Sequence, residues 1–212
     1  MKGDIKTNQE YAKQIAAYER RITALKKEQI AYLQGKYLSI ENKMFFWAKK
    51  ILNTKAGIIL DGVSFKLDET SFVIDIDDCD NFTLDDLSIV TEITPEAFYD
   101  HMNKGLRFVK DNFFQKQFSQ QLIVENKLLN KYLLLENNDF FYVQKIIRSD
   151  EYETTIAGLN LTVYDKCIFF CKEDINVRVI PEDVKEMTEE EFQKQVQQAI
   201  KVVEDSIPVK YR

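Results

Sequence analysis

Apolar residues near the start of the chain recur at helical spacing, in alternating steps of four and three residues. The members of this seam are Tyr11, Ile15, Tyr18, Ile22 and Leu25. Such steps form the heptad pattern of a coiled coil, and Thr7 followed by Glu10 is a capping-box pattern that opens a helix. The pattern therefore predicts a helix over residues 7–34 whose seam mediates self-association.

After Gly35 the apolar pattern restarts out of phase with the first seam. Its members are Tyr37, Ile40, Met44, Trp47 and Ile51, again three or four residues apart. Two structures fit this change of phase: one long helical rod with a stutter, or a helical hairpin of residues 7–34 and 38–53. We favour the rod. In both, residues 44–52 form a helix whose aromatic side chains pack where the helical segment meets the rest of the protein.

The remaining chain alternates between strand and helix signals. Residues 58–60, 63–67 and 71–76 predict short strands separated by turns, the first of them at Asp61-Gly62. Thr94 and Pro95 begin a helix that continues to about residue 135, either unbroken or with a break near Asn112 to Gln117. A second set of strands is predicted over residues 140–148, 153–164, 167–172 and 176–180, and a last helix over residues 188–205. The expected fold class is α+β.

The starts of the two later helices resemble each other. Residues 91–111 align without gaps on residues 185–205, with Thr, Glu, Phe, Val and Asp at matched places. Two antiparallel β-meander plus helix units, related by an internal duplication, would explain the match. Shared caps and amphipathic stripes in unrelated helices would explain it too. The expected organisation is a basic helical segment over residues 1–55 and an α+β domain over residues 56–212, with halves 56–136 and 137–212.

Charge is distributed very unevenly along the chain. Residues 1–55 hold twelve Lys and Arg against five Asp and Glu, whereas residues 61–100 hold one Lys against twelve Asp and Glu. Separated patches of opposite sign steer association with charged partners and do not determine a fold. This asymmetry points to a function that depends on partners.

The basic residues of the first segment form a ridge at heptad spacing, opposite the seam. Its members are Lys6, Lys13, Arg20 and Lys27. Such a ridge could contact a phosphate backbone or an acidic protein surface. It also matches the solvated outer face of a coiled coil, which we favour because no base-stacking aromatic residues are interleaved with the cations.

The acidic residues gather into one block. Its members are Asp75, Asp77, Asp78, Asp80, Asp85 and Asp86. An EF-hand fails here because Asp80 occupies the position where that loop needs glycine. Three interpretations stay open: a divalent-metal phosphodiesterase site, an imitation of a phosphate string that enters a basic groove, and an acidic surface that docks on a basic one. We favour the last and expect no bound metal.

Candidate catalytic chemistry is sparse. The sequence contains no nucleophile elbow, phosphate-binding loop, dinucleotide fingerprint or zinc-binding spacing, and His101 is its single histidine. Cys167 and Cys171, four residues apart, are expected to be small buried apolar residues. We therefore expect no catalytic residue and no cofactor. The odd cysteine count and the lack of a long apolar run predict a cytoplasmic protein that does not enter a membrane.

The sequence thus predicts a non-enzymatic protein–protein interaction module. It would self-associate as a homo-oligomer and present an acidic surface to a basic protein partner, as a phage-type inhibitor of a nucleic-acid-binding machine would. One alternative is a nucleic-acid-binding protein that uses the basic N-terminal helix. A second is the metal-dependent phosphodiesterase that uses the aspartates.

Overall fold

The computed structural model of the chain describes residues 8–54, 57–76, 83–84, 87–114, 127–135, 138–149, 153–180 and 184–208. In chain order its elements are α1 (Asn8–Leu33), β1 (Tyr37–Ile40), β2 (Met44–Thr54), β3 (Gly57–Leu67), β4 (Ser71–Ile76), β5 (Thr83–Leu84), β6 (Val90–Ile93), α2 (Pro95–Phe113), β7 (Tyr132–Leu134), β8 (Asp139–Ser149), β9 (Thr154–Tyr164), β10 (Cys167–Val179), β11 (Lys185–Met187) and α3 (Glu189–Ser206).

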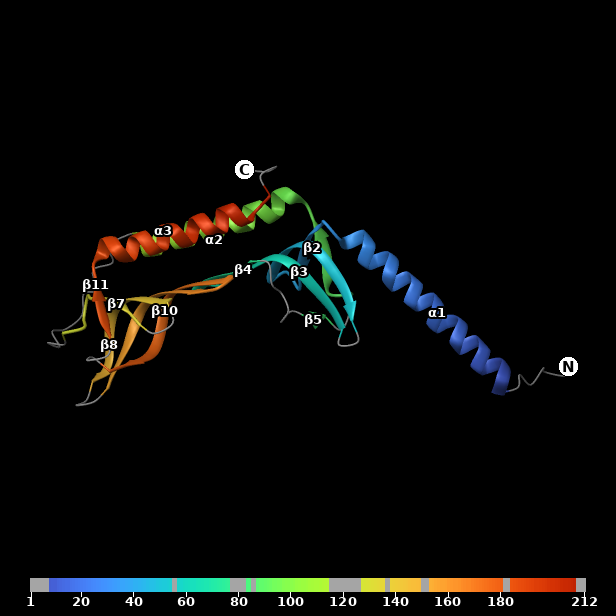
Figure 1. Cartoon of the computed structure of the whole chain (residues 1–212), viewed down its shortest axis with the longest axis horizontal. Coiled ribbons are helices and arrows are strands. Elements are labelled where there is room, and N and C mark those ends of the chain that lie inside the picture. The colour runs from blue at the N-terminus through green and yellow to red at the C-terminus, as the bar shows by residue number, and fades with distance from the viewer. Residues whose placement is uncertain are drawn as a thin grey trace.

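The strands form one antiparallel sheet in the order β11-β7-β8-β9-β10-β4-β3-β2-β1-β6, with β5 paired to β3. Helices α2 and α3 lie together along one face of this sheet, and α1 extends away from it at the β1–β2 end (Figure 1). The predicted α+β class is confirmed in this form: an N-terminal helix, one large antiparallel sheet and two further helices.

The first predicted helix is confirmed, and it ends where the sequence changes phase. α1 ends at Leu33, and Gly35 then adopts a left-handed conformation with φ of 80°. Glycine reaches this conformation at little cost because it lacks a Cβ atom. The Gly35 amide donates to the Ala48 carbonyl over 2.6 Å. The chain therefore turns from the helix directly into the sheet.

The helix predicted over residues 38–53 is wrong, both as part of a rod and as the second arm of a hairpin. This segment is the β1–β2 hairpin, joined by a turn in which Glu41 and Asn42 have φ of 51° and 56°. Phe45 and Phe46 point to opposite faces of the sheet, and both are buried. A strand that is buried on both faces does not alternate between apolar and polar residues. The apolar residues of this segment therefore matched the helical spacing of three and four residues by coincidence.

The strands predicted at residues 58–60 and 63–67 are one strand, β3. The turn expected at Asp61-Gly62 is instead a site where the paired strand β2 bulges between Ala48 and Lys50. A Cβ atom on Gly62 would lie 2.0 Å from the Trp47 carbonyl oxygen. Glycine is therefore required here for close strand contact and not for chain reversal.

The helix predicted from Thr94 is α2, which ends at Phe113, inside the range of the expected break. Its predicted extension to residue 135 is wrong at Tyr132–Leu134, which form strand β7. The second set of strands is confirmed, except that residues 167–172 and 176–180 belong largely to the single bulged strand β10. The last helix is confirmed as α3. Its capping box is complete, because the Thr188 hydroxyl accepts from the Glu191 amide over 3.1 Å and Glu191 Oε2 accepts from the Thr188 amide over 2.7 Å.

The main core lies between the sheet and the helix pair. The phenyl ring of Phe72, on β4, is fully buried and fills the space that a side chain at Gly105 of α2 would take. Phe113 near the end of α2 stacks on Phe192 near the start of α3, whereas Tyr99 near the start of α2 donates to the Pro208 carbonyl. The two helices are therefore antiparallel to each other.

Two smaller clusters occupy the opposite face of the sheet. One joins the last turns of α1 to β1, β2 and β3 through Ile30, Leu33, Leu38 and Phe46. The other lies at the far end of the sheet and includes Phe141. The sheet thus has a shared core on its helical face and separate cores on the other face.

The same order of elements occurs twice. The series β1-β2-β3-β4-β6-α2 is matched by β7-β8-β9-β10-β11-α3. Corresponding contacts recur, since Asn130 donates to Val143 as Gly35 does to Ala48, and a Cβ on Gly158 would lie 1.9 Å from the Tyr142 oxygen. We call these two series the first and second units.

Strands β4 and β10 join the two units with two-fold register. Phe72 pairs with Phe170, and Ile74 pairs with Ile168, on either side of the Val73–Phe169 pair. At the two ends, the Ile76 amide donates to the Lys166 carbonyl over 2.7 Å and the Lys172 amide donates to the Thr70 carbonyl over 2.9 Å. Each hydrogen bond is the counterpart of the other when the units are exchanged.

The close approach of Phe72 to α2 predicts that Gly105→Ala destabilises the protein. Overpacking costs about 1–3 kcal/mol, which exceeds the gain of up to about 1 kcal/mol in helix propensity. Chemical denaturation checks this. The double variant with Gly105→Ala and Phe72→Leu should lose less unfolding free energy than the two single variants lose in sum, by at least about 0.5 kcal/mol. Asn103→Ala, on the exposed side of the same helix, serves as the control, and strict additivity would contradict the proposed contact.

Candidate functional site

Helix α1 carries an apolar stripe that its own chain does not cover. Residues 8–29 are all exposed except for Ala16, which is half-buried. The seam predicted from the sequence is therefore in solvent, with exposed fractions of 52% to 65%. It comprises Tyr11 (52%), Ile15 (57%), Tyr18 (65%), Ile22 (54%) and Leu25 (55%), and Tyr32 (58%) continues it. We call these six residues the α1 stripe. A contiguous exposed apolar stripe marks a contact surface.

The end of α1 is fixed to the sheet by two kinds of contact. Ile30 and Leu33 are buried against the first unit. On the stripe side, the Tyr32 hydroxyl donates to Glu92 Oε2 of edge strand β6, and Lys36 Nζ lies 2.9 Å from Glu92 Oε1. These two donors lower the pKa of Glu92, and the same hydrogen bond raises the pKa of Tyr32.

Glu92 is a contact residue that nothing in the sequence around it marks as functional. No local pattern indicates that it pairs with a helix sixty residues earlier in the chain. Its counterpart in the second unit is Glu186, which pairs with Lys131 over 2.8 Å. The match between residues 91–111 and 185–205 could have suggested that both glutamates hold equivalent positions.

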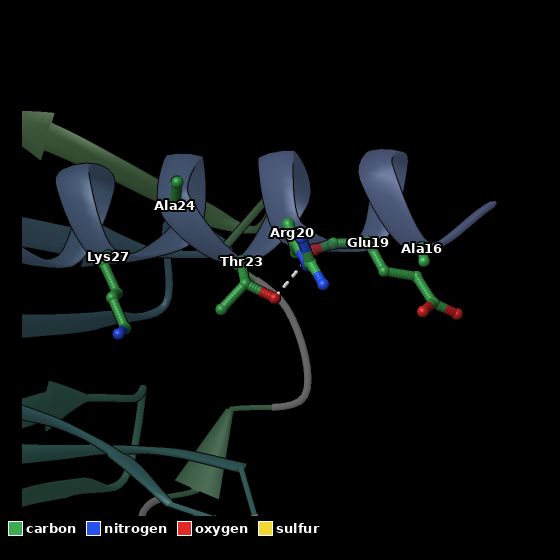
Figure 2. Close-up of a pocket in the computed structure, with 6 residues that line it drawn as sticks. All are labelled: Ala16, Glu19, Arg20, Thr23, Ala24 and Lys27. Atoms are coloured by element: carbon green, nitrogen blue, oxygen red, sulfur yellow. Dashed lines mark hydrogen bonds between the residues drawn. The ribbon is translucent and has the colours of Figure 1, made fainter. Parts of the chain in front are cut away.

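The basic ridge lies on another side of α1. Lys13, Arg20 and Lys27 are exposed, and Lys6 lies outside the described residues. Arg20 and Lys27 border a shallow hollow in the helix surface, whose lining residues are Ala16, Glu19, Arg20, Thr23, Ala24 and Lys27 (Figure 2). The Thr23 hydroxyl donates to the Glu19 carbonyl over 2.8 Å. All six residues come from one helix, so the hollow is a groove between its side chains.

The structure places one member of the acidic block. Asp75 lies on β4 and is half-buried, whereas Asp77, Asp78, Asp80, Asp85 and Asp86 lie outside the described residues. The acidic docking surface therefore stays a prediction. Across the described ranges, no group of three or more His, Cys, Asp and Glu side chains is arranged to hold a metal ion.

Cys167 and Cys171 lie on the same strand, β10, and both thiols are held in the neutral form. Burial, together with the neighbouring carboxylate of Asp75, raises the pKa of Cys167 to about 12. Burial also raises the pKa of Cys171. Metal binding and nucleophilic attack need the thiolate. The environment of both residues therefore favours the expected structural role.

The His101 side chain packs at the edge of the main core, where it contacts Phe45 and the backbone of its own helix. Its Nδ1 atom lies 2.8 Å from the Ala97 carbonyl oxygen, one turn earlier in α2. Its ring stacks on Phe45 with centroids 3.9 Å apart. A general base needs a reactive proton within hydrogen-bond reach, and these two contacts occupy one ring nitrogen and one ring face.

Comparison with protein-family models, with curated proteins and with solved structures finds no match to this chain. Within the described residues, no helix is both long and apolar enough to span a membrane. The most distinctive surface among the described residues is the α1 stripe.

The contact between Cys167 and Asp75 predicts how this thiol reacts. Its raised pKa leaves little thiolate at pH 8, so alkylation by iodoacetamide should be much slower than in the unfolded chain. Asp75→Asn removes the carboxylate charge, lowers the pKa of Cys167 and should speed alkylation several-fold. Mass spectrometry of the modified peptides provides the measurement. Cys171, which pairs with Ser71, is the internal control; equal acceleration of both thiols would indicate general loosening instead.

Proposed function

We propose that the protein self-associates through α1, with the α1 stripe packed against a second copy in a coiled coil. The observation that carries this proposal is the exposure of six large apolar side chains at heptad spacing along one helix. Water contact with such side chains is unfavourable, and removing about half of a large side chain's surface from water contributes on the order of 1 kcal/mol. A matching stripe on a second copy would cover most of the set at once.

The weak attachment of α1 to its own chain also supports the proposal. The helix is buried only at Ile30 and Leu33 among its described residues. In proteins, most of the stability of a helix comes from the packing of its apolar face and not from helix propensity alone. A partner helix would provide that packing along the exposed part of α1.

Self-association predicts a clear response to a charge placed in the stripe. Ile22→Asp should convert an oligomer into a monomer, because the carboxylate would be buried in the seam. Light scattering after size exclusion measures the mass. Ala24→Asp introduces the same charge on the same turn, outside the stripe, and should leave the oligomer intact. A monomeric wild-type protein at tens of micromolar would contradict the proposal, as would an oligomer that survives Ile22→Asp.

The same experiment distinguishes the nucleic-acid alternative. The basic ridge would remain exposed on the outer side of a coiled coil, so both functions could use one helix. Binding to phosphate backbone is strongly salt-dependent, whereas apolar self-association is not. A mass shift with a mixed nucleic-acid pool that vanishes at high salt, and after neutralisation of Lys13, Arg20 and Lys27, would favour the alternative.

We also propose that the first and second units arose by duplication of one β-meander plus helix unit. The repeated element order, the paired glycines Gly62 and Gly158 and the two-fold register of β4 with β10 support it. On this basis Ile168 corresponds to Phe72, and Ala199 corresponds to Gly105. The smaller sheet residue then faces the larger helix residue, as close packing requires.

This correspondence predicts that the large–small pair can be moved to the second unit. Ile168→Phe alone should cost about 1–3 kcal/mol through overpacking. The double variant that also carries Ala199→Gly should be more stable than the sum of the two single changes predicts, by at least about 0.5 kcal/mol. Chemical denaturation measures the unfolding free energy of each variant. Gln198→Gly, at the preceding exposed position, carries the same loss of helix propensity and should show no coupling. Equal coupling for both glycines would argue against equivalent positions.

A further inference from the structure

We infer that the second copy on the α1 stripe runs antiparallel to the first, in one register that its flanking charges select. This inference rests on the proposed self-association and specifies its geometry. With Ile15 and Ile22 at heptad position a, positions e and g border the seam. The charged residues at these positions are Glu19 and Lys26 (e) and Arg21 and Glu28 (g), and all four are exposed.

A parallel in-register pair is disfavoured by these residues. In that arrangement position g of one helix faces position e of the next heptad in the partner. Arg21 would then face Lys26 of the second copy, twice in the dimer because of its two-fold symmetry. Glu28 would face Leu33, which is already buried against its own sheet. The parallel pair thus gains no attractive contact between these charges.

In an antiparallel pair, position e faces position e of the partner helix and position g faces position g. The register of the two helices decides whether the charges at these positions attract or repel each other. When Ile22 packs beside Leu25 of the second copy, Arg21 meets Glu28 and Glu19 meets Lys26. Each contact occurs twice, so four attractive contacts flank the seam. Sliding by one heptad in one direction brings Arg21 to Arg21 and Glu19 to Glu19, and sliding in the other brings Glu28 to Glu28 and Lys26 to Lys26. Like charges at these positions disfavour both neighbours.

The favoured register covers five of the six stripe residues, and Tyr11 lies beyond the end of the overlap. Ile22 and Leu25 form the two central layers, Tyr18 lies opposite Gln29, and Ile15 lies opposite Tyr32. About twenty residues of each helix overlap, or roughly 30 Å at 1.5 Å per residue. The Tyr32 ring, whose hydroxyl is held by Glu92, offers a fixed surface at each end of the overlap.

Distances between identical spin labels in the two copies test the inference. Glu10→Cys and Ala24→Cys place labels at the same heptad position, in a background with the three native cysteines changed to alanine and an unchanged circular dichroism spectrum. The antiparallel register separates the Glu10 labels by roughly 40 Å or more, and brings the Ala24 labels within about 20 Å. Equal short distances at both sites would overturn the inference while leaving self-association intact. A monomer by light scattering would instead overturn self-association itself.

A charge exchange provides the second test. Glu28→Lys should weaken self-association about tenfold, because it sets a second positive charge against Arg21 of the other copy at two places. Adding Arg21→Glu restores opposite charges and should return the dissociation constant to near that of the wild type. In a parallel pair, Glu28→Lys faces no charge and has little effect. Sedimentation equilibrium at low and high salt measures both variants, and failure of the double variant to recover would overturn the antiparallel register.

Discussion

The pairing of β4 with β10 is the contact on which the rest of the structure depends. Each unit by itself presents one of these strands as an open sheet edge, with a row of unpaired amides and carbonyls. Joining the edges produces a continuous antiparallel sheet with a single helical face. Phe72, Ile74, Ile168 and Phe170 then share one core with α2 and α3. The antiparallel helix pair is a consequence of this junction, because each helix follows the last strand of its own unit.

The junction explains why the two faces of the sheet differ. On the helical face, side chains from both units meet across the β4–β10 pair, so one large core forms. On the other face, the central Val73–Phe169 pair is only half-buried and is flanked by Ser71 and Asp75, and the buried apolar clusters stay within their units. The first of these clusters receives Ile30 and Leu33, and this burial fixes where α1 leaves the sheet.

The sequence was informative where one face of an element meets water. Strands β8 and β9 were identified by their aromatic and β-branched residues, since adjacent positions in both strands are buried. The seam of α1 and the last helix repeat apolar positions at helical spacing, and periodicity identified them. It failed for β2, where Phe45 and Phe46 are buried on opposite faces. It also failed at Gly62, because a turn and a close strand contact both require glycine. The pairing of Tyr32 with Glu92 depends on tertiary structure alone and leaves no local signal.

The candidate site could be predicted from the sequence only in part, for a related physical reason. A heptad seam shows which side of a helix is apolar, but not whether the same chain covers it. The structure supplies that information, since the sheet ends its contact with α1 near Ile30 and the rest of the stripe meets solvent. The acidic block raises the opposite problem, because charge alone indicates attraction and not a geometry.

The relation between the two units and α1 has a consequence for any assembly. Inside the chain, pseudo-two-fold symmetry pairs equivalent strands and leaves β6 and β11 at the outer ends of the sheet. The α1 stripe begins beside β6, through the contact of Tyr32 with Glu92. A second two-fold axis through paired α1 helices would therefore link the two copies on the β6 side of each sheet, through the helices alone, and leave the β11 ends outermost. Antiparallel helices place the two sheets at opposite ends of the overlap, so the assembly would be elongated, with the helix pairs α2 and α3 far apart. Close approach of the two sheets would require parallel helices, which the charges at Arg21 and Lys26 oppose.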